Sequence, residues 1–327
     1  MTVAILIVNF NGGDLLRRCL ESIEQQRRRP DHIVVVDNGS SDDSLTRAEP
    51  LLRDVQLIRL PSNVGFASAN NIAARAARQY DALALLNPDA IADPDWLGQL
   101  VHAAEREPAV AAFASRMLLA STPRYLDGAG DSYHVSGRAW RNGHRVLSAD
   151  WPAADVEVFA PCAAAALYRR AAFDEVGGFD EHYFCYFEDV DLAFRLRLLG
   201  HRCLYVHSAI VRHVGSALSG YRSDFAVYHG ERNAVWTFFK DMPGPLLWLY
   251  LPHHIALNVA ALLYYPWRGQ GRVVLRAKVD AVRGLPSVLR RRRLVQRGRR
   301  VDAWTLRRAL RRGALAPYLA RYSMQAP

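Results

Sequence analysis

The sequence has little lysine and little cysteine. Only two of its 42 basic residues are Lys, so nearly all of the positive charge is carried by Arg. The four cysteines are far apart and form no Cys-x-x-Cys pair, which argues against a zinc site and against a secreted disulfide framework. The apolar start lacks a basic region ahead of it, so we do not expect a signal peptide. The composition therefore favours a globular protein of the cytosol.

The positive charge is concentrated near the end of the chain. Residues 283–312 contain twelve Arg and one acid, Asp302, a local charge of +11, whereas all 327 residues together carry +10. The rest of the chain is therefore close to neutral. An Arg-rich tail suits either nucleic acid or an anionic lipid surface. Because no nucleic-acid-binding motif accompanies the tail, we expect a lipid surface and consider nucleic acid an unlikely partner.

Aliphatic runs alternate with amphipathic stretches over the first 120 residues. We predict buried strands at 3–8, 32–36, 55–60, 81–86 and 110–117, and helices at 14–26, 68–78 and 93–107. Strands that alternate with helices at short intervals indicate an open α/β sheet with helices on both faces. Ligands bind such sheets beyond the carboxyl ends of the strands. Here those ends carry Asn9, Asp37 and Asp89, which predicts a binding site.

The middle of the chain holds a cluster of carboxylates among aromatic residues. Glu188, Asp189 and Asp191 precede apolar residues at helical spacing, so we expect them to open a helix. They either stabilise the helix start through its dipole or belong to a site in which like charges raise the pKa of one carboxyl. Residues 118–157, rich in Gly and polar residues, predict a long loop that is functional or mobile. We also predict a short helix at 169–176 and late strands at 203–206 and 209–211.

The chain changes character after residue 222. Residues 243–267 are apolar and aromatic without a charged side chain, but Pro252, His253 and His254 interrupt them. About 20 apolar residues span a bilayer, but a central Pro-His-His is costly there. We therefore favour a segment in the membrane plane, re-entrant or in a hairpin; the alternative is a buried helical pair. Together with the Arg-rich amphipathic stretch at 283–312, it supplies two signals for surface anchoring.

Six motifs occur in order between Val3 and about Ser216: V-N-F-N-G, V-V-D-N-G-S-S-D-D-S, N-V-G-F-A-S-A-N-N, L-N-P-D, G-G-F-D-E-x-Y-F-x-Y-F-E-D-V-D-L-x-x-R and H-V-G-S. In this order they resemble glycosyltransferase family 2, and they are most similar to its bacterial rhamnosyltransferase-like members. The resemblance implies the GT-A fold, a Rossmann-like open mixed sheet with helices on both faces, over residues 1–222. A helical, membrane-associating extension would then occupy residues 223–327.

The resemblance also implies an activity. Family members transfer a sugar from a nucleoside diphosphate sugar to an acceptor hydroxyl with inversion at the anomeric carbon. This reaction needs a divalent cation, Mn²⁺ or Mg²⁺, beside the leaving diphosphate and a general base beside the acceptor hydroxyl. The resemblance favours dTDP-L-rhamnose as the donor, with UDP-hexoses as the alternative. The acceptor would be a lipid-linked or cell-surface glycan at the inner face of the cytoplasmic membrane.

Residue by residue, the resemblance assigns a nucleotide site. Asp37 matches the aspartate that accepts a hydrogen bond from the nucleobase; a carboxylate suits the N–H of uracil or thymine because it only accepts. Its alternative role is a helix cap or a turn. Gly65 would allow a close approach of the backbone to the phosphates. The predicted nucleotide-sugar-binding residues are Asn9, Asn11, Asp37, Asn38, Asn63, Gly65, Asn70 and Asn87.

The metal and the base are assigned in the same way. Asp89 matches the last aspartate of the family's DxD signature, but Asn87 replaces the first one, so a further ligand is expected. His213 matches a downstream histidine that completes the metal shell in some relatives, and imidazole favours Mn²⁺. Asp189 matches the general base. Glu188 and Asp191 remain alternatives for that role.

Two other functional classes fit the sequence less well. A nucleotidyltransferase on a related sheet usually carries a Gly-rich phosphate loop with Lys or Arg after the first strand, and N-F-N-G-G-D has no such basic residue. A non-catalytic sugar-nucleotide or membrane-binding module would be expected to lose Asp89, Asp189 or His213, and all three are present. The sequence therefore favours the glycosyltransferase.

Overall fold

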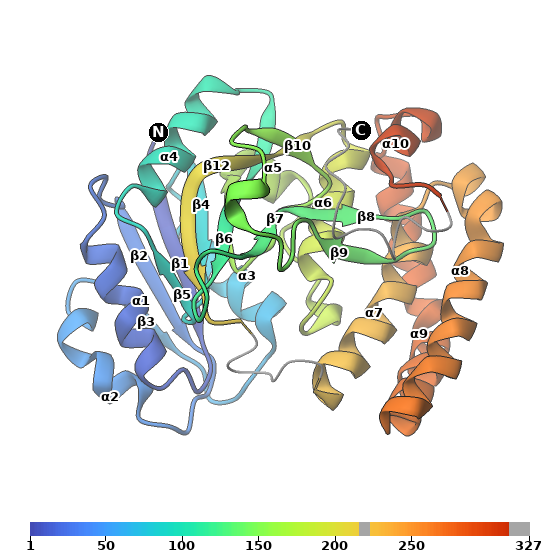
Figure 1. Ribbon diagram of the computed structural model, residues 1–327, viewed down its shortest axis with the longest axis horizontal. Helices are drawn as coiled ribbons and strands as arrows, with labels where there is room; N and C mark the ends of the chain where they lie inside the picture. Colours follow the sequence, from blue (N-terminus) through green and yellow to red (C-terminus); the bar gives the residue numbers. More distant parts are fainter. Residues whose placement is uncertain (216–222, 314–327) are drawn as a thin grey trace.

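The computed structural model describes residues 1–215 and 223–313, which form an α/β body with a helical extension on one side (Figure 1). Ser216 of the H-V-G-S motif and the end of the chain lie outside this range. The strands are β1 (Val3–Asn9), β2 (His32–Asp37), β3 (Gln56–Arg59), β4 (Ala82–Leu86), β5 (Ala90–Ala92), β6 (Val110–Leu119), β7 (Leu126–Ala129), β8 (Asp131–Tyr133), β9 (Ala139–Arg141), β10 (Val156–Val158), β11 (Ala165–Arg169) and β12 (Arg202–His213). The α-helices are α1 (Asp14–Glu24), α2 (Ser44–Ala48), α3 (Phe66–Ala76), α4 (Trp96–Arg106), α5 (Arg170–Glu175), α6 (Glu188–Leu198), α7 (Asp224–Asp241), α8 (Gly244–Tyr264), α9 (Gly271–Gly298) and α10 (Ala303–Ala309).

The central sheet is mixed. Its main strand order is β10-β12-β6-β11-β4-β1-β2-β3, with β5 paired to β12 and β7 paired to β6. β1 runs parallel to both β2 and β4, and its register places Asn9 opposite Asp37. β11 is antiparallel to both of its neighbours, β4 and β6. The polar residues that end β1 and β2 are therefore adjacent at one edge of the sheet.

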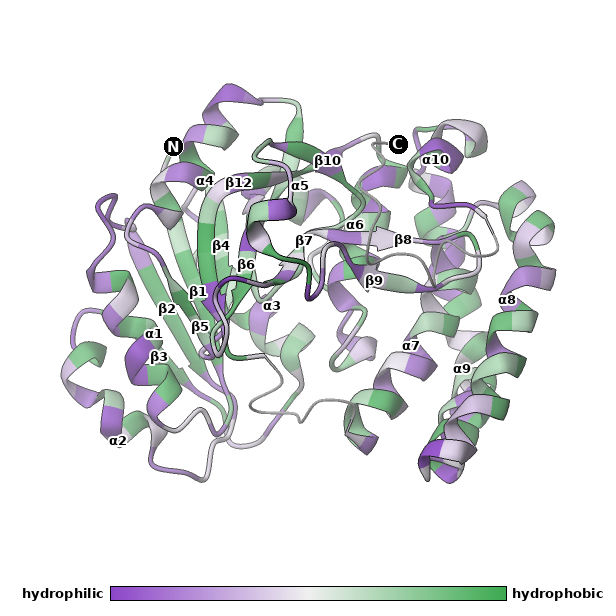
Figure 2. Ribbon diagram, in the orientation of Figure 1, coloured by the Kyte–Doolittle hydropathy of each residue, from purple (hydrophilic) through white to green (hydrophobic). Residues whose placement is uncertain are grey.

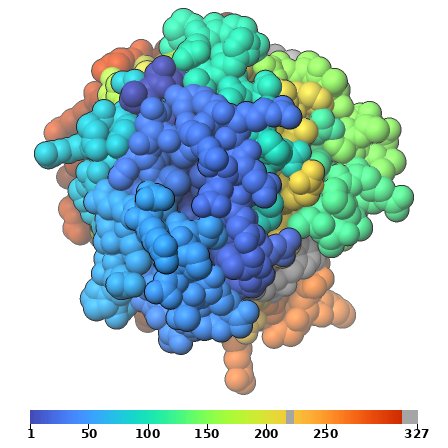
Figure 3. All heavy atoms as spheres, turned by 90° about the vertical axis from the view of Figure 1, so that its left-hand side faces the viewer, coloured from blue at the N-terminus to red at the C-terminus, as the bar shows by residue number. Residues whose placement is uncertain are grey.

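Helices cover both faces of this sheet, as the strand–helix alternation predicts. Along β1, Ile5 and Ile7 belong to the apolar core that includes α1 and α4 residues. Leu6 and Val8 belong to the core that includes α3 and α6 residues. This alternation follows from the period of two in a strand. Figure 2 shows the central strands mainly in green, the hydrophobic colour, and Figure 3 shows the face that the N-terminal part of the chain forms in blue.

The strands and helices predicted in the first 120 residues are present, with ends that differ by a few residues. The prediction of a long loop at 118–157 is wrong. This region contains β7, the β8–β9 hairpin and the start of β10, and much of it is buried. These strands have three or four residues, and the polar side chains of β7 and β8 are buried, so they lack the alternating apolar pattern of longer strands. The two late strands form one, β12, whose register shifts between Val206 and Ile210.

The C-terminal helices pack on the α/β body through α7. α7 contacts α6 and lies along α9, while α8 and α9 form the right-hand edge of the molecule in Figure 1. The helix α8 runs through Pro252 without interruption. Its inner face buries Tyr250 and His254, whereas Trp248 and Leu263 are 72% and 67% exposed. Among the described residues, Gly244–Arg268 is the one helical stretch long and apolar enough to cross a membrane by length and composition.

A buried ion network joins α7 and α9 to the start of α6. Lys240 on α7 forms ion pairs with Asp191 on α6 and, at 2.6 Å, with Asp180. Arg195, one turn after Asp191, binds the same carboxylate at 2.7 Å, and Arg291 on α9 lies 3.1 Å from Asp180. The side chains of Lys240 and Asp191 are 2% and 0% exposed. Each buried charge therefore has an opposite charge in contact, which is the condition for burying it.

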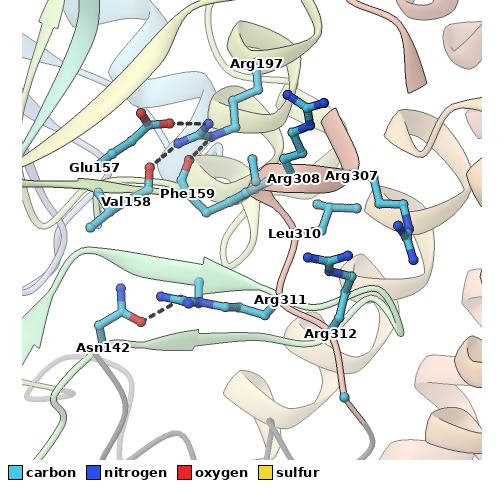
Figure 4. A pocket seen from close by; sticks show the side chains of 13 residues that line it. Asn142, Glu157, Val158, Phe159, Arg197, Arg307, Arg308, Leu310, Arg311 and Arg312 are labelled. Carbon is cyan, nitrogen blue, oxygen red and sulfur yellow. Dashed lines mark hydrogen bonds and ion pairs between the residues drawn. The ribbon is translucent and has the colours of Figure 1, made fainter. Parts of the chain in front are cut away.

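Part of the Arg-rich tail binds the protein itself. Arg292 donates to the carbonyl oxygens of Phe239 and Met242 at the end of α7, at 2.8 and 2.6 Å. Arg300 pairs with Glu175 at 2.7 Å. At the end of α10 and directly after it, the side chains of residues 307–312 line a pocket beside β8 and β10 (Figure 4). The membrane-binding role predicted for residues 283–312 therefore stays a prediction, and only part of their charge is available for it.

Replacing Lys240 with Met tests the buried network. We expect the free energy of unfolding to fall by about 3–5 kcal/mol, because Asp191 and Asp180 lose a buried counter-charge. Urea denaturation followed by fluorescence measures the change. Arg293→Met, at an exposed position on α9, is the control and is expected to stay within about 0.5 kcal/mol of the parent protein. Equal stability of the two variants would contradict the role given to the network.

Candidate active site

The predicted nucleobase carboxylate lies at the carboxyl edge of the sheet. Asp37 ends β2 and is 5% exposed. The amide nitrogen of Asn9, at the end of β1, donates to Oδ1 of Asp37 at 3.0 Å and to the hydroxyls of Ser40 and Ser44 at 3.1 and 2.9 Å. Asn9 thus fixes the orientation of Asp37. The structure brings these two predicted residues together.

The turn before α3 lies beside this pair. Asn38 donates to Oδ1 of Asn63 at 3.0 Å and accepts from the backbone N–H of Val64 at 2.9 Å. Oδ1 of Asn63 also accepts from the N–H of Gly65 at 2.8 Å. Gly65 has a φ of +88°, and a Cβ there would lie 2.6 Å from the ring of Phe184. Only glycine fits this position, because the backbone is left-handed and the ring of Phe184 packs directly on it.

Three further predicted binders have local structural contacts. Asn11 has a φ of 52° and accepts from the N–H of Ser41 at 2.8 Å. The amide nitrogen of Asn70 donates to the carbonyl of Phe66, one turn earlier in α3, at 2.9 Å. Asn87 lies between β4 and β5, and its N–H donates to the carbonyl of Ala164 at 2.8 Å. Their predicted contacts with the donor therefore stay predictions.

Asp89 and His213 are adjacent although 124 positions separate them in the chain. β12 pairs with β5, and this register brings His213 opposite Ala90. Nε2 of His213 lies 3.4 Å from Oδ1 of Asp89, and this oxygen is buried with no hydrogen-bond partner in the described residues. Nδ1 of His213 donates to Oδ2 of Asp127, on β7, at 2.8 Å. Asp127 thus orients the imidazole so that Nε2 faces Asp89.

The charges around His213 shift its pKa and that of Asp127. Burial lowers the pKa of His213, but the hydrogen bond to Asp127 and the Asp89 carboxylate outweigh it and raise this pKa to about 8. Burial raises the pKa of Asp127, but Arg141, His144 and His213 outweigh it and hold this pKa well below its usual range. Asp127 therefore remains ionised.

Asp89 and His213 could supply two of the ligands of a divalent cation. No group of three or more His, Cys, Asp or Glu side chains that could hold a metal ion occurs in residues 1–215 and 223–313. Asp89 Oδ1, an acceptor without a hydrogen bond, and His213 Nε2 face each other at 3.4 Å. A carboxylate and an imidazole are both ligands of Mn²⁺. The pair fits an ion whose remaining ligands come from a bound diphosphate and water.

Glu188, Asp189 and Asp191 open α6 as predicted, but their environments differ. Asp189 Oδ2 accepts from the N–H of Ala163 at 3.1 Å, and its Oδ1 accepts from its neighbour Val190 at 2.8 Å. Burial raises the pKa of Asp189, and these hydrogen bonds and Arg141 partly offset it. Burial is thus the main cause of this shift, where the sequence suggested like-charge repulsion.

The pKa values of the two alternative acids, Glu188 and Asp191, are shifted in opposite directions. Burial, and then the charge of Asp189, raise the pKa of Glu188 well above its usual value, so its neutral form is favoured. Burial opposes ionisation of Asp191 too, but Arg195 and Lys240 outweigh it and lower its pKa. Asp191 is fully occupied by these two cations. Asp189 combines a raised pKa with main-chain N–H donors, those of Ala163 and Val190, that hold its carboxylate.

The loop before Asp189 is held in an unusual backbone conformation. Phe184, Tyr186 and Phe187 have φ angles of 64°, 66° and 68°. Such angles are costly for bulky residues and concentrate at functional sites. The amide nitrogen of Asn233 on α7, which is completely buried, lies within 3.0 Å of the carbonyl oxygens of Tyr183, Cys185 and Tyr186. α7 therefore supports the loop that carries the candidate base.

Arg141 lies beside Asp127 and acts electrostatically on the candidate base. Its guanidinium forms an ion pair with Asp127, and its charge partly offsets the burial that raises the pKa values of Asp131 and Asp189. Burial still raises the pKa of Asp131 well above its usual value. The sequence analysis missed Arg141 and Asn233, because neither belongs to a motif. The Gly-rich polar stretch at 118–157, taken for a loop, was the one signal that could have pointed to Arg141.

Comparisons with known proteins agree with this geometry. A model of Glycosyl transferase family 2 matches residues 4–177, more than half of the chain. The chain is 30% identical over 282 residues to N-acetylglucosaminyl-diphospho-decaprenol L-rhamnosyltransferase of Mycobacterium tuberculosis, covering 75% of this chain and 87% of the relative. It is 27% identical over 215 residues to an O-antigen chain rhamnosyltransferase of Salmonella typhimurium, covering 65% of this chain and 66% of the relative.

A solved structure shares the fold. The mannosyltransferase PcManGT from Pyrobaculum calidifontis, in complex with GDP-Man and Mn²⁺, superimposes with a TM-score of 0.56 at 18% identity, covering 86% of each chain. The mixed sheet with helices on both faces is the GT-A fold that the motifs predicted. The chain belongs to glycosyltransferase family 2 and is a glycosyltransferase that resembles the bacterial rhamnosyltransferases.

Proposed function

We propose that this enzyme transfers a sugar, with inversion, from a nucleoside diphosphate sugar to a hydroxyl of a lipid-linked or cell-surface glycan. The observation that supports it most is that Asp127, which orients His213 toward Asp89, is paired with Arg141, whose charge also acts on Asp189. This arrangement combines a cation site for the leaving diphosphate with a partly buried carboxylate for the acceptor hydroxyl. A single displacement at the anomeric carbon needs these two groups on opposite sides of the sugar.

The donor site extends from Asp37 to Asp89 along the sheet edge. The Asp37 carboxylate, held by Asn9, would accept a hydrogen bond from the imide N–H of thymine or uracil. Two rhamnosyltransferases among the relatives favour dTDP-L-rhamnose, with UDP-hexoses as the alternative. Asp89 Oδ1 and His213 Nε2 would hold Mn²⁺ or Mg²⁺. This ion supplies positive charge to the diphosphate as its bond to the sugar breaks.

Asp189 is the proposed base. Its carboxylate takes the proton of the acceptor hydroxyl as the oxygen attacks the sugar. A raised pKa brings Asp189 closer to working pH, where proton transfer is most effective. The Ala163 N–H and the start of α6 stabilise its ionised form before the reaction. The neutral Glu188 next to it adds no second negative charge.

The acceptor and the place of action follow from the relatives and from α8. One relative is named for an acceptor that carries N-acetylglucosamine on a lipid diphosphate. The outer side of α8 and the following turn expose Trp248, Leu263 and Trp267, the last at 90%. Aromatic and aliphatic side chains beside many Arg residues suit the interface of an anionic membrane. We therefore place the enzyme at the inner face of the cytoplasmic membrane, with α8 lying along it.

Asp189→Asn tests the base and the proposed reaction together. With dTDP-L-rhamnose and an N-acetylglucosaminyl-diphospho-lipid acceptor, we expect kcat to fall by about 100- to 10,000-fold, because the amide cannot take a proton. The donor should still bind. Glu188→Gln copies the neutral acid and should stay within about tenfold of the parent enzyme. Loss in the Gln variant with activity kept in the Asn variant would move the base to Glu188.

Asp127→Asn tests how the metal pair is positioned. Loss of the carboxylate that orients His213 should raise the Mn²⁺ concentration for half-maximal activity by about 10- to 100-fold. Asp131→Asn is the matched control: Asp131 lies opposite the same Arg141, and burial raises its pKa and favours its neutral form, so the variant should keep the parent requirement. An unchanged Mn²⁺ requirement in Asp127→Asn would show that His213 does not bind the ion.

Replacing Trp248 and Trp267 with Ser tests the membrane contact. We expect less protein to sediment with vesicles that contain anionic phosphatidylglycerol, because two exposed interfacial anchors are lost. Activity on a water-soluble acceptor should not change. Leu147→Ser, at an exposed position of the catalytic body, serves as the control. Sedimentation of the double variant at the level of the parent protein would count against α8 as the membrane face.

A further inference from the structure

A second cavity lies between the C-terminal helices and the catalytic loop. It has a volume of about 670 Å³ and is lined by residues of α7, α8 and α9, by Arg138 and Ala139 of the β8–β9 hairpin, and by Tyr186 and Phe187. Ligand pockets are typically about 300–1,000 Å³. Phe187 directly precedes Glu188 and the candidate base Asp189. The cavity therefore reaches the loop that carries the candidate base.

The walls of the cavity are apolar and built from small side chains. On α7, the residues Ala226, Gly230 and Ala234 recur every fourth position and face it. Ala260 and Ala261 line it from α8. A Cβ added at Gly230 would meet no atom within 4 Å. The space beside α7 is therefore open, and no side chain of the described residues fills it.

One buried polar side chain on the wall has an unused acceptor. His254 is 3% exposed and stacks on Phe238 with ring centroids 4.0 Å apart. Nδ1 carries the proton, because it bonds to the carbonyl oxygen of Ser136 at 2.8 Å. Nε2 is then an acceptor, and it has no hydrogen-bond partner in the part of the chain that the structure describes. Buried polar atoms in proteins are nearly always bonded, so an unpartnered one calls for a ligand or a water.

The cavity continues toward the surface that the proposed function places on the membrane. Ala260 lines both this cavity and the apolar outer surface of α8, which includes Ile255, Val259 and Leu263. Arg268 lines the cavity from an exposed position. Lys278 lies on its wall, paired with Glu231 at 2.6 Å. A ligand here meets apolar walls, basic side chains and the catalytic loop in one continuous space.

We propose that this cavity binds the lipid-proximal end of the acceptor. The first part of a hydrocarbon chain packs on the small residues of α7 and α8, and the attached diphosphate lies beside Arg268 and Lys278. A hydroxyl or N–H of the carrier-linked sugar donates to Nε2 of His254. The chain then leaves beside α8 toward the bilayer, and the sugar lies next to Phe187 and Asp189. This inference rests on the proposed function, and it assigns the acceptor's lipid to a defined site.

Gly230→Leu is the test, because it fills the cavity from a helical position where leucine is favoured over glycine and the fold is preserved. Farnesyl diphosphate is the probe, with inorganic diphosphate for comparison, and calorimetry on the full-length protein measures both affinities. We expect the variant to bind farnesyl diphosphate about tenfold more weakly, the effect of losing about two buried methylene groups. Its affinity for diphosphate should not change. Equal affinities of the two proteins for farnesyl diphosphate would overturn the proposal.

Gly298→Leu is the matched control. A Cβ at Gly298 also meets no atom within 4 Å, but this residue does not line the cavity, so it should bind both probes like the parent protein. Weaker farnesyl diphosphate binding in this variant as well would also overturn the assignment.

Transfer assays test the lipid site separately from the reaction. With one sugar diphosphate on a long or a two-carbon chain, Gly230→Leu should raise KM about tenfold for the long chain alone.

A parent protein that transfers to neither acceptor would refute the proposed function. If farnesyl diphosphate binding still weakened in Gly230→Leu under those conditions, the lipid site itself would stand. Equal KM changes for the long and short chains would overturn the lipid site while leaving the reaction intact. The two proposals therefore fail through different measurements.

Discussion

The buried charges at the start of α6 are the constraint on which the rest of the structure depends. A carboxylate kept as a base needs a dry, fixed position, but burying several acids together is costly unless each has a counter-charge or a proton. The enzyme resolves this conflict residue by residue. Asp191 is paired with Lys240 and Arg195, burial favours the neutral form of Glu188, and the carboxylate of Asp189 accepts from main-chain donors. The counter-charge Lys240 comes from α7, so the base depends on the C-terminal helices.

This dependence gives the C-terminal region two roles. Asn233 on α7 holds the strained loop before Asp189, while His254 on α8 contacts Ser136 of the catalytic body. The same helix α8 exposes Trp248 on its other side. A helix that contacts the catalytic body on one face and suits a membrane on the other offers a direct route for a lipid-linked acceptor. The packing of the C-terminal region on the α/β body also explains why many Arg residues of the tail bind carbonyls and carboxylates of the protein and are not all exposed.

The sequence predicted the sheet and its helices well, because long aliphatic runs such as β1 have a strong periodic signal. It also predicted that Asp37, Asp89 and the acids of α6 lie at strand or helix ends. It could not predict that Asp127 orients His213 or that Arg141 pairs with Asp127. Those contacts come from short strands whose polar residues follow no pattern. The division of labour among Glu188, Asp189 and Asp191 depends on Lys240, about 50 residues later, and no local spacing reveals it.

The most direct test of this account is the binding of dTDP with and without Mn²⁺, measured by titration calorimetry in the absence of acceptor. If Asp89 and His213 hold an ion that also binds the donor diphosphate, Mn²⁺ must strengthen dTDP binding, and dTDP must strengthen Mn²⁺ binding by the same factor. We predict an increase of at least about tenfold, within the usual range of such couplings. The same affinity for dTDP with Mn²⁺, with Mg²⁺ and with neither would contradict the proposed site.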